Sequence, residues 1–89
     1  MAAITPSTVV RHSIGSNVLL ACTFAGTADD GDTWASGLST NIIGYWANAS
    51  DDPTTQTSGG VDVGLSSGTF TFYLGEDNRA FILYVLTTN

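Results

Sequence analysis

The sequence predicts an all-β protein, a small antiparallel β-sandwich or β-barrel of about six to seven short strands. Three observations support this fold class. Runs rich in β-branched and aromatic residues alternate in polarity, turn-forming residues recur every eight to twelve positions, and no segment of useful length has a helical period. The 89 residues leave room for one domain, residues 1–89, in which residues 1–8 are a candidate extended N-terminal arm.

Two strands are expected in the first third of the chain. Thr8–Ile14 and Asn17–Ala25 are β-branched or aliphatic runs, and the Gly-Ser pair between them is typical of a tight turn. The stretch Gly26–Ser39 is rich in Gly and Asp, which favour turns, so we expect a loop held to the core by Trp34 and Leu38.

The middle of the chain predicts one strand followed by a polar connection. Asn41–Asn48 reads as a short strand with both faces partly buried. Its alternation places Ile43, Tyr45 and Ala47 on one face, and Ile42, Gly44 and Trp46 on the other. The polar run Ala49–Gly60 then leads to Val61–Leu65, which alternates as a half-buried strand does.

The C-terminal third predicts a hairpin. Thr69–Leu74 alternates strictly, with Phe70, Phe72 and Leu74 on the core face, and Gly75–Asn78 forms the turn. The return strand, Ala80–Leu86, is apolar on both faces, which requires two covers.

One of those covers is hypothesised to be another protein molecule. The hypothesis assigns Phe81, Leu83 and Val85 to an interface with another subunit or another protein. A charge placed at Leu83 distinguishes the two possibilities: it breaks an oligomer if Leu83 is at the interface, and unfolds the monomer if Leu83 is in the core.

Charge excludes two classes of partner. The chain has two basic residues, eight acidic residues and a net charge of −6. Without a basic patch it lacks the electrostatic term that attracts proteins to nucleic acid or to anionic membranes, so neither is an expected partner. The first residues lack a basic and apolar leader pattern, so a soluble intracellular product is expected.

The sequence offers little chemistry, and we expect no enzyme and no cofactor. His12 is the only histidine, and Cys22 lies in an apolar run, where it reads as a small buried hydrophobe. The aspartates of the Asp29–Asp32 loop, and those at Asp51–Asp52, lack the ligand spacing of a calcium loop and read as solvated turn residues, with a loosely bound cation as the alternative. No metal site is therefore predicted.

Two segments resemble small structural proteins of tailed bacteriophages. They are Ile43–Gln56 and Ser67–Asn78, the latter followed by the ending Leu83–Leu86, with Gly31–Trp34 as a further point of similarity. The resemblance implies a head decoration (cement) protein on the capsid exterior of a virion, with the major capsid protein as partner and no catalytic residue.

Further expectations follow from that resemblance. The N-terminal segment is a candidate arm that adds to a capsid sheet edge, with Ile4, Thr5, Pro6, Val9 and Arg11 as contact residues. Three-fold positions on shells favour a homotrimer. The alternatives are a tail-tube or connector subunit, or a surface domain that binds host carbohydrate through Trp34, Tyr45 and Trp46.

Overall fold

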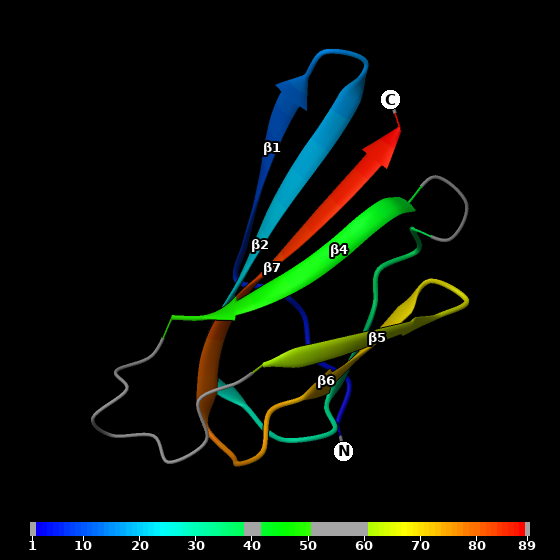
Figure 1. Cartoon of the computed structure of the whole chain (residues 1–89). Coiled ribbons are helices and arrows are strands. Elements are labelled where there is room, and N and C mark those ends of the chain that lie inside the picture. Colours follow the sequence, from blue (N-terminus) through cyan, green and yellow to red (C-terminus); the bar gives the residue numbers. More distant parts are fainter. Residues whose placement is uncertain (1, 39–41, 51–60, 89) are drawn as a thin grey trace.

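The computed structural model describes residues 2–38, 42–50 and 61–88, and these form an all-β molecule without a helix (Figure 1). Seven antiparallel strands make two sheets that do not close into a barrel. No helix capable of crossing a membrane occurs in the described ranges. The strands are β1 (Thr8–Ile14), β2 (Asn17–Ala28), β3 (Thr33–Ala35), β4 (Ile42–Ala49), β5 (Asp62–Ser66), β6 (Thr69–Tyr73) and β7 (Arg79–Thr88).

The larger sheet has four strands in the order β1-β2-β7-β4. The turn between β1 and β2 has Gly15 at φ 60°, the positive φ that a type II′ hairpin turn requires at its first central position. The pairing of β1 with β2 runs without a register shift from Thr8 opposite Thr23 to Ile14 opposite Asn17. This hairpin is therefore regular from end to end, as expected.

The smaller sheet has the order β3-β6-β5. Ser67 and Gly68 both have positive φ, 51° and 80°, as in the type I′ turns that join tight hairpins. The strand β3 lies inside the segment that we expected to be only a loop, and it forms because it pairs with β6, with Trp34 opposite Phe70. Its outer edge is covered by the N-terminal residues, since Ala3 bridges Thr33 in parallel.

The core lies between the two sheets and is dominated by aromatic rings. Phe24 is at its centre, stacked on Phe81 with ring centroids 4.7 Å apart and in contact with Phe72 at 5.1 Å. Trp34 packs edge-on against Phe24 and stacks on Phe70. The two sheets are therefore held together by rings contributed from both.

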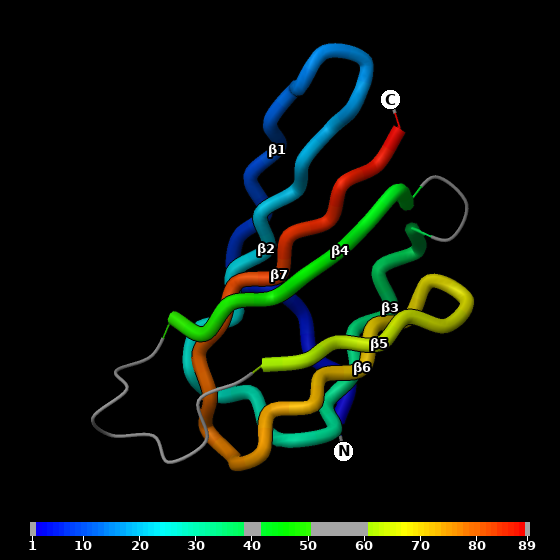
Figure 2. Tube along the Cα trace, viewed as in Figure 1, coloured from blue at the N-terminus to red at the C-terminus, as the bar shows by residue number. Residues whose placement is uncertain are grey.

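The β1–β2 hairpin extends past the smaller sheet (Figure 2). Among the strands, β1 contacts only β2, and all seven of its residues are exposed. The molecule is accordingly elongated, with principal extents of 39 × 23 × 19 Å over the described residues.

Strand β4 corrects one detail of the expected alternation. A register shift between Ile42 and Gly44 makes Ile43 the extra residue of a bulge. Ile42 consequently packs against the core on the same side as Ala47, whereas simple alternation had placed these two residues on opposite faces.

Candidate functional site

The two sheets have outer faces of opposite character. On the smaller sheet, the residues that alternate with the core positions are mostly hydroxyl-bearing or small: Thr33, Ala35, Asp62, Gly64, Ser66, Thr69, Thr71 and Tyr73. This is the usual pattern of a sheet with one buried and one solvated face. Among the residues of this face that the structure describes, Tyr73, 56% exposed, is the one large exposed side chain with apolar surface.

The larger sheet has an outer face that is apolar. Cross-strand pairing aligns Val10, Ala21, Tyr84 and Trp46 in one row, and His12, Leu19, Leu86 and Gly44 in the next. A third row contains Thr8, Thr23, Ile82 and Asn48. We call the seven apolar residues of these rows the outer apolar face: Val10, Leu19, Ala21, Trp46, Ile82, Tyr84 and Leu86.

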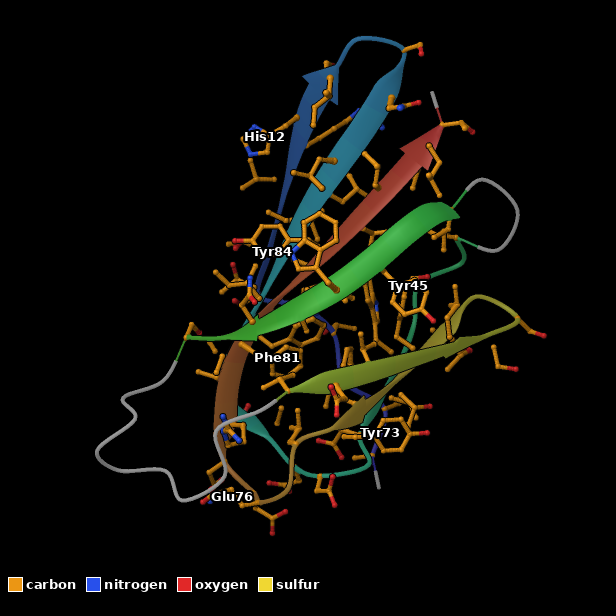
Figure 3. All side chains as sticks on the ribbon, viewed as in Figure 1. His12, Tyr45, Tyr73, Glu76, Phe81 and Tyr84 are labelled. Carbon is orange, nitrogen blue, oxygen red and sulfur yellow. The ribbon has the colours of Figure 1, made fainter. Side chains whose placement is uncertain are left out.

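This face is open to solvent in the single chain. Val10 is 48% exposed and Trp46 is 45% exposed, and the other five members are partly exposed. The Trp46 and Tyr84 rings stack on each other at 5.3 Å, and Tyr84 lies over the four-stranded sheet in Figure 3. A half-exposed apolar face on a protein whose core is already buried between its sheets indicates a surface that binds another molecule.

The charged residues are segregated from this face. The four strands of the larger sheet contain no carboxylate in their sequences. Among the described residues, the carboxylates lie in the β2–β3 connection, on β5 and in the β6–β7 turn: Asp29, Asp30, Asp32, Asp62, Glu76 and Asp77. The protein thus has an uncharged apolar face and a separate acidic end.

The residues assigned from sequence to an interface on β7 lie elsewhere. Phe81, Leu83 and Val85 are all 0% exposed and belong to the core between the sheets. That assignment is therefore wrong for the single chain, because the smaller sheet already covers this side of β7. The opposite side, which includes Ile82 and Tyr84, is the one left uncovered.

The N-terminal residues do not form a projecting arm. The Ile4 amide donates to the Thr33 carbonyl at 2.7 Å, and the Thr33 amide donates to the Ala2 carbonyl at 2.9 Å. The segment was expected to add to a sheet edge of the capsid protein, but here its main-chain hydrogen bonds join it to an edge of its own chain. Ile4 also packs against the core, whereas Thr5 is exposed and Pro6 half-buried.

Two further expected interface residues lie on β1 and are accessible. Val9 is 50% exposed, and Arg11 is exposed as well. Both point to the side of the larger sheet that faces the core, because they pair with Cys22 and Leu20. They lie on the part of the hairpin that the smaller sheet does not reach.

The three aromatic residues expected to form a sugar platform do not share a surface. Trp34 is a core residue stacked on Phe70, and Tyr45 packs edge-on against the same ring at 5.5 Å. Trp46 points to the opposite side of β4, onto Tyr84. The platform as expected from sequence is therefore not formed.

The aspartates of the β2–β3 connection accept hydrogen bonds from the backbone. Asp32 is 3% exposed and its two carboxylate oxygens accept from the amides of Ala2 at 2.9 Å and Asp29 at 2.8 Å. Asp30 accepts from the Leu74 amide at 2.9 Å. These carboxylates tie the N-terminal segment and the β6–β7 turn to the loop, and no group of three or more metal-ligating side chains is found in the described part of the chain.

His12 and Cys22, the two side chains with catalytic chemistry, lie in different places in the fold. His12 is exposed on β1, and Cys22 is fully buried in the core. Burial raises the pKa of the Cys22 thiol to about 11, so the reactive thiolate is scarce at neutral pH.

Comparison of the chain with protein-family models, with curated proteins and with solved structures gives no significant match.

The outer apolar face was not identified from sequence as a unit. The signal that could have found it is the row structure, since Val10, Ala21 and Tyr84 align only once the strand order is known.

Proposed function

We propose that the chain is a decoration (cement) protein of a tailed-phage head, which binds the outer surface of the assembled major capsid shell and stabilises it without catalysis. The outer apolar face is the contact surface in this proposal. The resemblance of the sequence to phage structural proteins suggests that the protein is part of a virion. The chemistry of the outer apolar face supports binding to another protein.

The observation that carries the proposal is the contrast between the two outer faces. One sheet presents Thr, Ser and Asp to water, as a free domain does, while the other presents half-exposed Val10 and Trp46 in a field without carboxylates. A protein that coats a surface needs this polarity, because the apolar side binds and the acidic side faces solvent. Like charge on the solvent side also keeps coated particles apart.

The size of the face matches a specific contact. Four strands about 4.8 Å apart and on average about nine residues long, at about 3.3 Å per residue, give roughly 600 Å² for the whole outer side of the larger sheet, which contains the outer apolar face. Counting both partners, an interface of about 1,200 Å² is at the lower end of the range for stable specific complexes.

Binding of this kind stabilises the shell by mass action. A ligand that binds the assembled shell and not the free capsid protein contributes about 2.7 kcal/mol per site at a free concentration one hundred times its Kd. Many identical sites on one shell make the total large even when each contact is modest.

Co-sedimentation with undecorated shells tests the proposal. The purified protein should bind shells saturably, and should not bind unassembled capsid protein. Trp46→Ser should weaken binding at least tenfold, because large aromatic side chains that become buried in an interface contribute much of its energy. Tyr73→Ser is the matched control, since Tyr73 is 56% exposed, against 45% for Trp46, but lies on the polar face of the smaller sheet.

Failure of the proposal has a clear form. Absence of shell binding, or equal loss in the Trp46 and Tyr73 variants, would remove the outer apolar face from this role. Tubes or rings formed by the protein alone would favour a tail-tube subunit. Binding to host glycan that is lost in Trp46→Ser would favour the carbohydrate alternative, for which the stacked Trp46–Tyr84 pair is the remaining aromatic surface.

A further inference from the structure

The two sheets have four edges, and three of them are covered or irregular. The edge at β3 is bridged by Ala3 of the N-terminal segment. The edges at β4 and β5 approach each other, and β4 has a bulge at Ile43. Bulges and covering segments are the devices that keep sheet edges from pairing with other chains.

The fourth edge, β1, has none of these protections. Its seven residues pair with β2 in continuous register, all seven are exposed, and β1 contacts no other strand. Its sequence contains neither proline nor lysine, and Arg11 is its one permanently charged residue. An exposed, regular edge of this length is a template for another strand.

The pairing register determines which main-chain groups β1 offers. In a two-residue hairpin turn the residue before the turn accepts from the residue after it, so Ile14 and Asn17 form a hydrogen-bonded pair. Alternation along an antiparallel ladder then directs the N–H and C=O groups of Val9, Arg11 and Ser13 away from β2. These three residues are the ones available to a new strand.

We propose that β1 pairs with β1 of a second copy, antiparallel and about a two-fold axis at Val10. This inference concerns the free protein and does not depend on shell binding. A second copy is the occupant because the edge is self-complementary under a two-fold axis, the symmetry of most homodimers. Two chains of net charge −6 also meet at this edge without a carboxylate in either strand.

Charge and side-chain type select the register. With the axis at Val10, Val9 lies opposite Arg11 of the second copy, and Thr8 lies opposite His12. An axis at Arg11 would set two guanidinium groups directly opposite each other, which is destabilising in a cross-strand pair. An axis at His12 would pair two imidazoles. An axis at Val9 would also pair two valines, but it would pair only Thr8–Val10 of each β1, whereas the axis at Val10 pairs Thr8–His12.

The pairing has a structural consequence for the outer apolar face. It joins two four-stranded sheets into one eight-stranded sheet, in which β1 of each copy is at the centre. Val10 is a member of the outer apolar face, so the two faces become one continuous surface of roughly 1,200 Å². A dimer is expected in place of the homotrimer that shell symmetry suggests.

Cysteine cross-linking of the free protein tests this geometry. On the axis, the two Val10 residues form a non-hydrogen-bonded pair with Cα atoms about 4.5 Å apart, a separation that a disulfide spans. Val10→Cys, oxidised with oxidised glutathione, should give a disulfide-linked dimer as the main product. The native Cys22 does not interfere, because it is fully buried.

Ile14→Cys is the matched control. Ile14 is 52% exposed against 48% for Val10 and lies on the same face of the same strand. In the proposed register its two copies are separated by about eight residues along the strands, on the order of 25 Å, so no disulfide should form. Equal cross-linking of both variants, or none of Val10→Cys, overturns the proposal.

A second measurement avoids cysteine. Sedimentation equilibrium should show a concentration-dependent dimer for the natural sequence, which Val10→Asp should weaken at least tenfold because it sets two carboxylates opposite each other. Ile14→Asp should leave the dimer in place. A monomer at all concentrations, or a trimer, overturns the two-fold pairing even if the protein still binds shells.

Discussion

Leu83→Ala is the sharpest test of which side of β7 faces the core. Leu83 is 0% exposed and is flanked across the sheet by Cys22 and Ala47 on the same side. Removing a fully buried leucine costs the lost transfer free energy plus a cavity term, about 2–5 kcal/mol. A chain of 89 residues has a total stability of roughly 4–13 kcal/mol, so the loss is a large share of it.

The expected observable is a large drop in thermal and chemical stability. A loss of about 3 kcal/mol lowers Tm by roughly 12–24 °C in a domain of this size. Urea unfolding followed by tryptophan fluorescence measures it directly, because Trp34 packs against Phe24 and Phe70 in the core. The slope of the transition should stay unchanged, since the mutation removes contacts without changing the surface exposed on unfolding.

Leu86→Ala is the control that makes the result decisive. Leu86 lies on the same strand with the same side chain, but on the outer apolar face, where it is partly exposed. Its truncation should cost at most about 1 kcal/mol. If Leu86→Ala is the more destabilising of the two, the faces of β7 are assigned the wrong way round, and Leu83 returns to the interface where sequence reasoning first placed it.

Three other outcomes are expected. Asp32→Ala should destabilise the protein by about 2–4 kcal/mol, because two backbone N–H groups lose their carboxylate acceptor, and it should speed amide exchange at Ile4. Asp62→Ala is the control: Asp62 is exposed, so its loss should change stability by less than about 0.5 kcal/mol. Burial raises the pKa of Cys22 from 9.0 to about 11, so between these pH values the folded state keeps a proton that the unfolded chain loses. The free energy of unfolding should therefore fall by up to about 3 kcal/mol as pH rises from about 9 to 11. Cys22→Ala should lack this pH-dependent loss. Acrylamide should quench Trp46, which is 45% exposed, more strongly than Trp34, which is partly buried against the core, so Trp46→Phe should lower the quenching constant; an unchanged constant would contradict this difference in exposure.

Most of the strands could be predicted from local pattern. The first strand has the expected bounds, Thr8–Ile14, because β-branched residues fill it and a glycine turn ends it. The alternation of Thr69–Leu74 likewise identified Phe70, Phe72 and Leu74 as core residues. Where polarity alternates cleanly, a period of two fixes both the strand and its buried face.

The errors come from places where that period is ambiguous or is overruled by distant contacts. Both faces of β7 are apolar, so alternation grouped Phe81 with Leu83 correctly but did not say which group meets the smaller sheet. Strand β3 has only three residues and exists because β6 pairs with it. The N-terminal segment likewise owes its position to Thr33, which is distant in sequence.

Under the two proposals, the outer apolar face and the free edge of β1 both determine the affinity of the protein for the shell. A single face of roughly 600 Å² gives a modest affinity, because association entropy offsets much of the gain. Once two copies pair through β1, the second face meets the shell as an intramolecular event at an effective concentration that can reach the millimolar range. Val10→Asp should therefore weaken shell binding by more than the loss of one side chain from the face, and Val10→Cys, once oxidised, should bind more tightly than the natural protein.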